Sequence, residues 1–253
     1  QRSSLAGVIL RMMDLGLGVV QDFAFIDPPK QKAIADGYQL LAELGAIDED
    51  QALTPLGKTL SRWPLDPRVA RMLLAAHEFG ALTEVLVIAA ALSVQDVRER
   101  PLDKQAQADQ AHKPFDDPKS EFVGLLRLWA WTHQVRGGQS VVGQPSTPKL
   151  SNRQVEQKLR EQFINVRRLR EWRDVHKQLS ATVTEHGWKL NTEPATYEQL
   201  HKALLTGLLG NIGCKSDAED WYLGARGIKF WKHPGAHLSK KPGRWLVAAE
   251  LVE

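Results

Sequence analysis

The chain has 253 residues, of which 43% are hydrophobic and 25% charged, a balance typical of ordinary globular proteins. Its single cysteine, Cys214, excludes a disulfide framework and a thiolate metal cage. No run of about 18 apolar residues occurs, and the first residues lack the basic-then-apolar pattern of an export signal. We therefore expect a cytoplasmic protein with no membrane partner.

The net charge of +3 is unevenly spread along the chain. Residues 1–150 carry 16 basic and 18 acidic side chains, whereas residues 151–253 carry 17 and 12. Between Trp221 and Ala249 there are six basic residues and no acidic one. This asymmetry favours a polyanionic partner for the C-terminal end, although a solvated basic surface would give the same counts.

The first 65 residues predict three short helices with little strand between them. Hydrophobic residues recur at helical spacing near the N-terminus, and a second helix follows Pro29 and ends at Gly45. Thr54 and Pro55 are suited to the cap and first position of a third helix. This pattern predicts a winged-helix domain over residues 1–65.

Residues 66–205 are predicted to form a helical bundle. The Asp66-Pro67 pair is suited to start a helix, and Gly80 to end it. The almost wholly apolar segment after Thr83 predicts a second helix that is capped by this threonine and buried on most sides.

Two loops are expected within this bundle. Residues 101–118 contain three prolines and predict little regular structure, and residues 137–148 are rich in Gly, Ser, Gln and Pro. Apolar residues around Leu128 share one helical face between these loops. Two or more helices are expected from Ser151 to about His186.

After Leu205 glycines become frequent, and short β-type runs lie between them. The expected strands are residues 208–212, 221–225, 228–232 and 245–251. Short strands at even spacing indicate a small β-barrel or sandwich. Because the chain ends at Glu253, we expect this third domain, residues 206–253, to be short of strands and incomplete. The predicted fold class is multidomain and mainly α, with a winged helix, a helical bundle and a small β-barrel.

No self-contained catalytic site is predicted. Gly57-Lys58-Thr59 has the letters of a phosphate-binding loop, but Ala52 replaces the required upstream glycine and Pro55 begins a helix. The eight histidines are scattered, and none belongs to the His-Glu-x-x-His spacing of zinc sites. We therefore expect no catalytic residue, no metal site and no ATP hydrolysis by this chain alone.

Four segments follow one another in an order that resembles a known family. They are Leu53 to Lys58 with Trp63 to Pro67, Leu92 to Pro101, Asn165 to Leu169, and Ala203 to Gly207 with His233 to Gly235. The sequences from Gln95 to Pro101 and from Val247 to Glu253 add to the resemblance. Together they resemble the C-terminal half of DEAH-box RNA helicases, most of all the bacterial HrpA branch.

The resemblance implies a fold order of two RecA-like motor domains, winged helix, ratchet and OB-fold, of which only the last three fit this chain. It implies an enzyme that uses ATP to move 3′→5′ along single-stranded RNA, and this chain would form one wall of the RNA channel. ATP and magnesium would belong to the motor domains, so no cofactor is expected here. The implied partners are single-stranded RNA and the motor domains of the same protein.

Candidate RNA-binding residues come from the resemblance in the bundle and from charge in the β-rich end. By resemblance, Ser93, Asp96 and Arg100 occupy ratchet positions that approach RNA. Several relatives carry Asn in place of Asp96, and a carboxylate suits a base or a 2′-hydroxyl better than a phosphate. A helix end and a helix cap are the competing interpretation of Ser93 and Asp96. The basic candidates in the OB-like end are Lys215, Arg226, Lys229, Lys232, His233, Lys240, Lys241 and Arg244.

The β-rich end also contains aromatic residues near its cations. Trp221, Trp231 and Trp245 offer flat faces on which the bases of a single strand stack. A tryptophan in a small barrel is more often part of the core, so a structural role is the competing interpretation.

Two other functions remain open from the sequence. A winged-helix regulator would bind duplex DNA through residues 1–65, but eight acidic residues within the first 50 oppose this. A protein-interaction scaffold would show no salt-dependent RNA binding.

Overall fold

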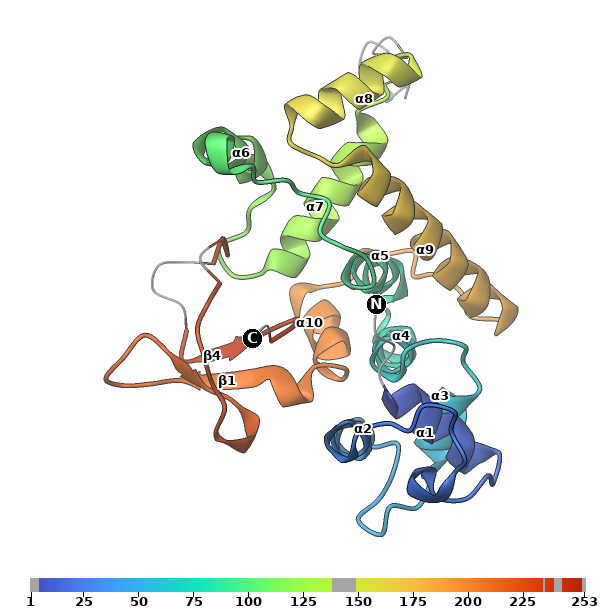
Figure 1. Ribbon diagram of the computed structural model, residues 1–253. Helices are drawn as coiled ribbons and strands as arrows, with labels where there is room; N and C mark the ends of the chain where they lie inside the picture. Colours follow the sequence, from blue (N-terminus) through green and yellow to red (C-terminus); the bar gives the residue numbers. More distant parts are fainter. Residues whose placement is uncertain (1–4, 138–148, 234, 239–242, 252–253) are drawn as a thin grey trace. The chain divides into compact units, whose positions relative to one another are not determined.

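The computed structural model describes residues 5–137, 149–233, 235–238 and 243–251 (Figure 1). The chain forms two compact units, and neither is one continuous stretch. The first contains Gln1–Val85, Leu190–Trp231 and Arg244–Glu253, and the second contains Leu86–Lys189 and Lys232–Gly243. The three predicted domains divide the chain by sequence pattern, and their boundaries stay predictions.

The first unit begins with the three predicted helices, which are α1 (Leu5–Asp14), α2 (Gln31–Glu43) and α3 (Pro55–Ser61), with a short 3-10 helix, η1 (Val20–Asp22), after α1. The helices α1 and α2 pack closely because α2 carries a glycine at the contact. A Cβ atom on Gly37 would lie 2.7 Å from Cδ1 of Ile9. The bridge between Ile47 and Leu53 is the little strand expected before α3.

Thr54 caps α3 as its sequence position predicts. Its hydroxyl oxygen accepts a hydrogen bond from the Gly57 amide at 3.0 Å. The same hydroxyl donates to the carbonyl oxygen of Gly45 at 2.7 Å. Gly45 has a φ of 72°, the left-handed conformation with which helices commonly end. Thr54 therefore joins the end of α2 to the start of α3.

The same unit contains α4 (Pro67–Phe79) and α10 (Tyr197–Leu205), which pack against each other. Asp66 caps α4 by accepting from the Arg68 amide at 2.9 Å, and Gly80 ends it at a φ of 71°, both as predicted. Just beyond α10, a Cβ atom on Gly207 would lie 2.7 Å from the Met72 side chain. The glycine thus permits the close approach of the two segments.

The predicted cap of α5 (Leu82–Leu92) is wrong. Thr83 lies inside the helix, and its amide donates to Oδ1 of Asn191 at 2.8 Å. Glu84 accepts from the Asn191 side chain at 3.0 Å and from the Ala195 amide at 2.9 Å. The cap comes from a residue 108 positions away, which no local pattern can reveal. Most of the helix is buried, as its apolar sequence predicts.

The β-rich part of the first unit is an antiparallel sheet with the strand order β3-β2-β1-β4. Its strands are β1 (Ile212–Lys215), β2 (Tyr222–Leu223), β3 (Lys229–Phe230) and β4 (Trp245–Val247), and a short helix, η5 (Ala225–Gly227), precedes β3. On its buried face Tyr222 and Phe230 stack with ring centroids 5.8 Å apart. They leave no room for a side chain at Gly213. The sheet occupies the place of the predicted barrel, and its assignment as an OB-fold stays a prediction.

The strand predicted over residues 208–212 is wrong in position. Residues Leu209–Asn211 form a 3-10 helix, η4, and the strand begins only at Ile212. Successive turns cause the delay, because the Leu208 amide donates to the Leu205 carbonyl at 2.9 Å and the Asn211 amide donates to the Leu208 carbonyl at 2.9 Å. The chain thus turns tightly as it leaves α10 before it can extend.

The second unit is helical, with α6 (Gln105–His112), α7 (Glu121–Gln134), α8 (Asn152–Glu161) and α9 (Val166–Glu185). Ser151 caps α8, and Asn165 caps α9 by accepting from the Arg168 amide at 3.0 Å. Trp172 is fully buried, and its Nε1–H donates to the Val87 carbonyl at 2.9 Å. This bond ties the long α9 to the second half of α5.

The expectation of little regular structure over residues 101–118 is wrong, because α6 lies there between two 3-10 turns, η2 (Leu102–Lys104) and η3 (Lys113–Phe115). The prolines do not prevent this, since Pro101 precedes η2 and Pro114 lies at the start of η3, positions that need no amide donor. The buried His112 anchors the helix by a 3.3 Å contact from its Nε2 to the Phe163 carbonyl. None of the helices described is long and apolar enough to cross a membrane.

Candidate nucleic-acid interface

The turn after α5 contains three of the predicted RNA-binding residues. Backbone hydrogen bonds hold it against the start of α9. The Asn165 amide donates to the Val97 carbonyl at 2.8 Å, and the Glu99 amide donates to the Phe163 carbonyl at 2.8 Å. Asp96 adds a third contact, because its carbonyl accepts from the Arg168 side chain at 3.0 Å. The turn is therefore fixed in shape.

Asp96 is engaged by a residue that the sequence did not single out. Its carboxylate accepts three hydrogen bonds from Arg98, from the backbone amide at 2.8 Å, from Nε at 3.1 Å and from Nη2 at 2.7 Å. Partial burial raises the pKa of Asp96, but the hydrogen bonds and charge of Arg98 outweigh it, so this pKa lies below its ordinary value. Asp96 thus holds Arg98, and a contact of Asp96 with a base stays a prediction.

Arg98 is the centre of a polar chain within the second unit. Its Nη1 donates to Nε2 of His237 at 3.2 Å, and Nδ1 of His237 lies 3.1 Å from a carboxylate oxygen of Asp116. The geometry suits a neutral His237 that donates through Nδ1 and accepts through Nε2. In the sequence, the only nearby indication that Arg98 would be held by a partner was Asp96, two positions earlier.

Arg100 lies on the surface, and another missed residue holds its guanidinium. Nε and Nη2 donate to the two carboxylate oxygens of Asp109 at 2.7 and 2.9 Å. The hydrogen bond from Arg100 lowers the pKa of Asp109. Both side chains are about half exposed. A phosphate can present the same pair of oxygens to an arginine, and contact of Arg100 with RNA stays a prediction.

Ser93 ends α5 rather than pointing freely into solvent. Its hydroxyl donates to the Ala89 carbonyl at 2.8 Å, and the residue is half-buried. This is the structural role that the sequence left open beside RNA binding. Contact of Ser93 with RNA stays a prediction.

Two of the predicted cations of the β-rich end lie in ion pairs. Arg226 contacts Asp36 at 3.7 Å and Glu43 at 4.0 Å, and its φ of 60° is left-handed, which is unusual for a residue other than glycine. Lys215 lies 3.5 Å from Asp220. These contacts compete with phosphate binding by both residues.

The other predicted cations have neutral partners. Lys229 lies 4.5 Å above the ring of Trp221. Lys232 donates to the Leu238 carbonyl at 3.2 Å, and His233 accepts from the Gly235 amide at 3.0 Å. Cys214 and, more weakly, Asp217 raise the pKa of Arg244. The residues in the first unit are Lys215, Arg226, Lys229 and Arg244, and those in the second are Ser93, Asp96, Arg100, Lys232 and His233. Lys240 and Lys241 lie outside the described residues.

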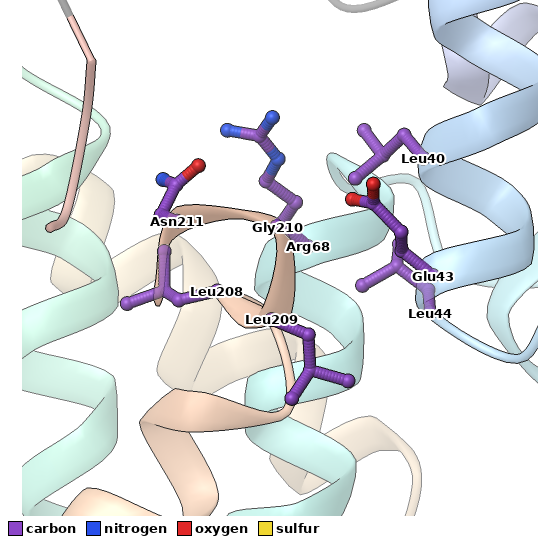
Figure 2. A pocket seen from close by; sticks show the side chains of 9 residues that line it. Leu40, Glu43, Leu44, Arg68, Leu208, Leu209, Gly210 and Asn211 are labelled. Atoms are coloured by element: carbon purple, nitrogen blue, oxygen red, sulfur yellow. The ribbon is translucent and has the colours of Figure 1, made fainter. Parts of the chain in front are cut away.

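A small pocket lies in the first unit between α2, α4 and η4 (Figure 2). Figure 2 shows the carboxylate of Glu43, the guanidinium of Arg68 and the amide of Asn211 around it, together with the side chains of Leu40, Leu44, Leu208 and Leu209. A Cβ atom on Gly210 would overlap the Glu43 carboxylate. The pocket is the space left where the segment from Gly207 to Asn211 packs against α2. Its polar groups carry opposite charges, so they favour no particular ligand.

Gly57-Lys58-Thr59 lies within α3. A Cβ atom on Gly57 would overlap the Ala46 carbonyl oxygen, so this glycine serves packing. Within the described ranges no group of three or more His, Cys, Asp or Glu side chains is arranged to hold a metal ion.

Comparison with known families adds an independent observation. Residues 38–65 match the winged-helix model of the helicase-associated domain (HA2), and residues 66–125 match its ratchet-like model. The turn that bears Asp96 and Arg100 lies inside the second match.

Curated relatives match along the whole chain. It is 43% identical over 257 residues to the ATP-dependent RNA helicase HrpA of Escherichia coli K12 and 41% identical over 259 residues to the HrpA homologue of Haemophilus influenzae. It is 28% identical over 254 residues to the pre-mRNA-splicing factor ATP-dependent RNA helicase prp22 of Schizosaccharomyces pombe. The matches cover 100% of this chain but only 19%, 19% and 20% of these relatives. Residues 38–125 therefore contain the winged-helix and ratchet-like parts of the helicase-associated HA2 domain, and the chain as a whole is similar to a part of HrpA-type RNA helicases.

Proposed function

We propose that this chain is an accessory part of an ATP-dependent 3′→5′ RNA helicase and forms one wall of the channel for single-stranded RNA. The observation that carries the proposal is the fixed turn from Asp96 to Arg100 in the ratchet-like part. It places a surface guanidinium on a backbone that the segment from Phe163 to Arg168 holds in shape. Pre-organised cations of this kind suit a strand that must be gripped without regard to its sequence.

Arg100 is the cation best suited to this role. Its partner Asp109 accepts hydrogen bonds from Nε and Nη2 at the surface, where an ion pair contributes little to stability. A phosphate could displace the carboxylate without leaving a buried charge unpaired. Lys229 and Lys232 are additional candidates, since their contacts are to neutral groups. Arg244 is a further candidate because its side chain is exposed.

The motor domains of the same parent protein are the second proposed partner. The segment between α1 and α2 exposes five large apolar side chains, which are Leu15, Leu17, Val19, Phe23 and Ile26. An exposed apolar segment of this kind is typical of an interaction surface. We expect it to contact the motor domains, which would bind ATP and magnesium and carry out the hydrolysis.

The test uses the full-length parent protein and an oligo-U strand at two salt concentrations. Arg100→Glu is expected to weaken binding about tenfold and to reduce the slope of log affinity against log salt by roughly 0.7. Asp109→Asn is expected to strengthen binding, because it removes the competing carboxylate. Arg167→Ala is the matched control, since Arg167 is also a surface arginine of the second unit paired with an acid.

If both Arg100→Glu and Asp109→Asn bind oligo-U with unchanged affinity, the turn does not contact RNA. Preferential binding of duplex DNA by residues 1–65 would favour a DNA-binding regulator. The absence of any salt-dependent RNA binding by the parent would favour a protein scaffold.

A further inference from the structure

The sheet of the first unit exposes two of its three tryptophans. Trp231 is 63% and Trp245 is 65% exposed, whereas Tyr222 and Phe230 are buried. A core role was the competing interpretation of these tryptophans, and the exposure of Trp231 and Trp245 contradicts it. Exposed apolar side chains mark an interaction surface when they form one contiguous patch, whereas single exposed side chains do not.

The strand register shows that the exposed side chains share one face. Cys214 pairs with Leu223 on one side and with Trp245 on the other, and Leu223 pairs with Lys229. Directly opposite residues in antiparallel strands point to the same side of a sheet. Lys229, Leu223, Cys214 and Trp245 therefore form one row across all four strands.

The next row on this face contains the other two tryptophans. Continuing the pairing of β2 with β3 by one residue places Trp221 opposite Trp231. The amide of Ser216 donates to the Trp221 carbonyl at 2.9 Å, so the neighbouring pairing also continues to this row. Residues two apart in a strand share a face, and these rows are separated by about 6.6 Å along the strands. All three tryptophans thus lie on the face opposite Tyr222 and Phe230.

The face also carries a cation, Lys229, whose side chain extends from the first row to the second. Lys229 rests over the ring of Trp221, and within the described part of the chain no carboxylate lies at ion-pair distance from it. The nearby β1–β2 loop is acidic, but two of its acids are engaged. Asp220 contacts Lys215, and Glu219 accepts from the indole N–H of Trp221. The face therefore combines flat aromatic surfaces with an available positive charge.

We infer that this face is a stacking surface for the bases of single-stranded RNA, with Trp231 and Trp245 as the stacking residues and Lys229 as a phosphate contact. The inference rests on the proposed function and specifies how the β-rich end would hold the strand. Stacking on an aromatic face accepts every base, as a helicase that moves along different sequences requires. An apolar protein segment would need no cation here.

The test compares leucine with phenylalanine at both positions in the full-length parent protein. Trp245→Leu and Trp231→Leu keep an apolar side chain but lose the aromatic face, whereas Trp245→Phe and Trp231→Phe keep it. If bases stack here, each leucine variant weakens oligo-U binding at least about fivefold, and the phenylalanine variants stay within about twofold of the parent. The leucine variants leave the salt dependence unchanged, whereas Lys229→Ala reduces it.

Leu190→Ala is the control, because Leu190 is a similarly exposed apolar residue of the first unit outside the sheet. Equal oligo-U affinity of the leucine and phenylalanine variants would overturn the inference. If Arg100→Glu still weakens oligo-U binding by the same parent protein, the proposed function stands. A parent protein that binds no RNA would overturn both. Far-ultraviolet circular dichroism identifies a leucine variant that fails to fold. In that case the phenylalanine variant at the same position is photocrosslinked to a strand that contains 4-thiouridine. A photo-adduct at the substituted position supports stacking, and its absence overturns it.

Discussion

Asp96 and Arg98 illustrate how a residue expected to contact a ligand can instead hold a neighbour in place. The carboxylate accepts from the backbone and side chain of Arg98, so it shapes the turn that presents Arg100. Arg98 is the more buried partner, with about a fifth of its side chain exposed. Loss of Asp96 would therefore leave a largely buried guanidinium with fewer acceptors.

Asp96→Asn is expected to lower the free energy of unfolding by about 1 kcal/mol at neutral pH, a modest value because half of the Asp96 side chain is exposed. The folded-state pKa of Asp96 lies below its unfolded value, so the carboxylate stabilises the fold above the unfolded pKa. This contribution disappears as the pH falls through the folded pKa. Urea unfolding at pH 7 and in strong acid should therefore show a difference at neutral pH that shrinks in acid. Asp103→Asn, at an exposed position of the same unit, should show neither effect.

Gly57 and Gly80 are both helix-associated glycines, but they are needed for different reasons. Gly57→Ala should destabilise by about 3 kcal/mol, because the added Cβ overlaps the Ala46 backbone. Gly80→Ala should cost about 1 kcal/mol, because the space is open and only the left-handed φ of 71° is unfavourable. Thermal and urea unfolding of the two variants would measure the difference. Equal costs would mean that the Ala46 carbonyl moves aside easily.

At the scale of elements, the helix ends show which parts of the fold local sequence can predict. The caps at Thr54 and Asp66 and the stop at Gly80 were predicted, because each signal lies within a few residues of the helix it bounds. The start of α5 was not, because its cap comes from Asn191.

Contacts between residues far apart in the sequence also explain why helix α6 and the partners of Arg98 and Arg100 were not predicted. Helix α6 depends on the contact of His112 with Phe163, which lies 51 positions later. The pairing of Arg100 with Asp109 and of Arg98 with His237 likewise requires the folded chain. Resemblance located Arg100 on the surface turn, but charge counting could not tell which cations of the β-rich end already had acidic partners.

Asn191→Ala is expected to lower the free energy of unfolding by about 2 kcal/mol, because the Thr83 amide loses its acceptor and Glu84 loses a donor. Hydrogen exchange of the amides in the first turn of α5 should accelerate more than exchange in α9. Asn152→Ala is the control, since Asn152 bonds an arginine on the surface. Similar losses in both variants would argue against a capping role for Asn191.

At the scale of the whole molecule, the RNA contacts of this chain are proposals, and its expected lack of ATP hydrolysis stays a prediction. The one sequence with phosphate-loop letters is inside a helix, and its glycine packs against backbone. The chain spans about a fifth of the length of the helicases it resembles. The catalytic steps of such an enzyme would therefore depend on the remaining four-fifths.

The purified chain is expected to show ATP hydrolysis at background level, with or without oligo-U, because its sequence contains no complete phosphate-loop motif. Phosphate release under saturating magnesium-ATP measures this, with the full-length parent as the positive control. RNA-stimulated turnover by the chain alone would contradict the expectation and would require a nucleotide site elsewhere in it.

The interleaving of the two compact units has a practical consequence for dissecting such a protein. The backbone passes from one unit to the other after Val85, Lys189, Trp231 and Gly243. A deletion series from the C-terminal end would remove β4 from one unit before it reached the 232–243 segment of the other. Activity lost in such a series could not be assigned to a missing module, because both units would be damaged within about twenty residues of shortening. Point substitutions on an intact chain are therefore the sounder way to map its functions.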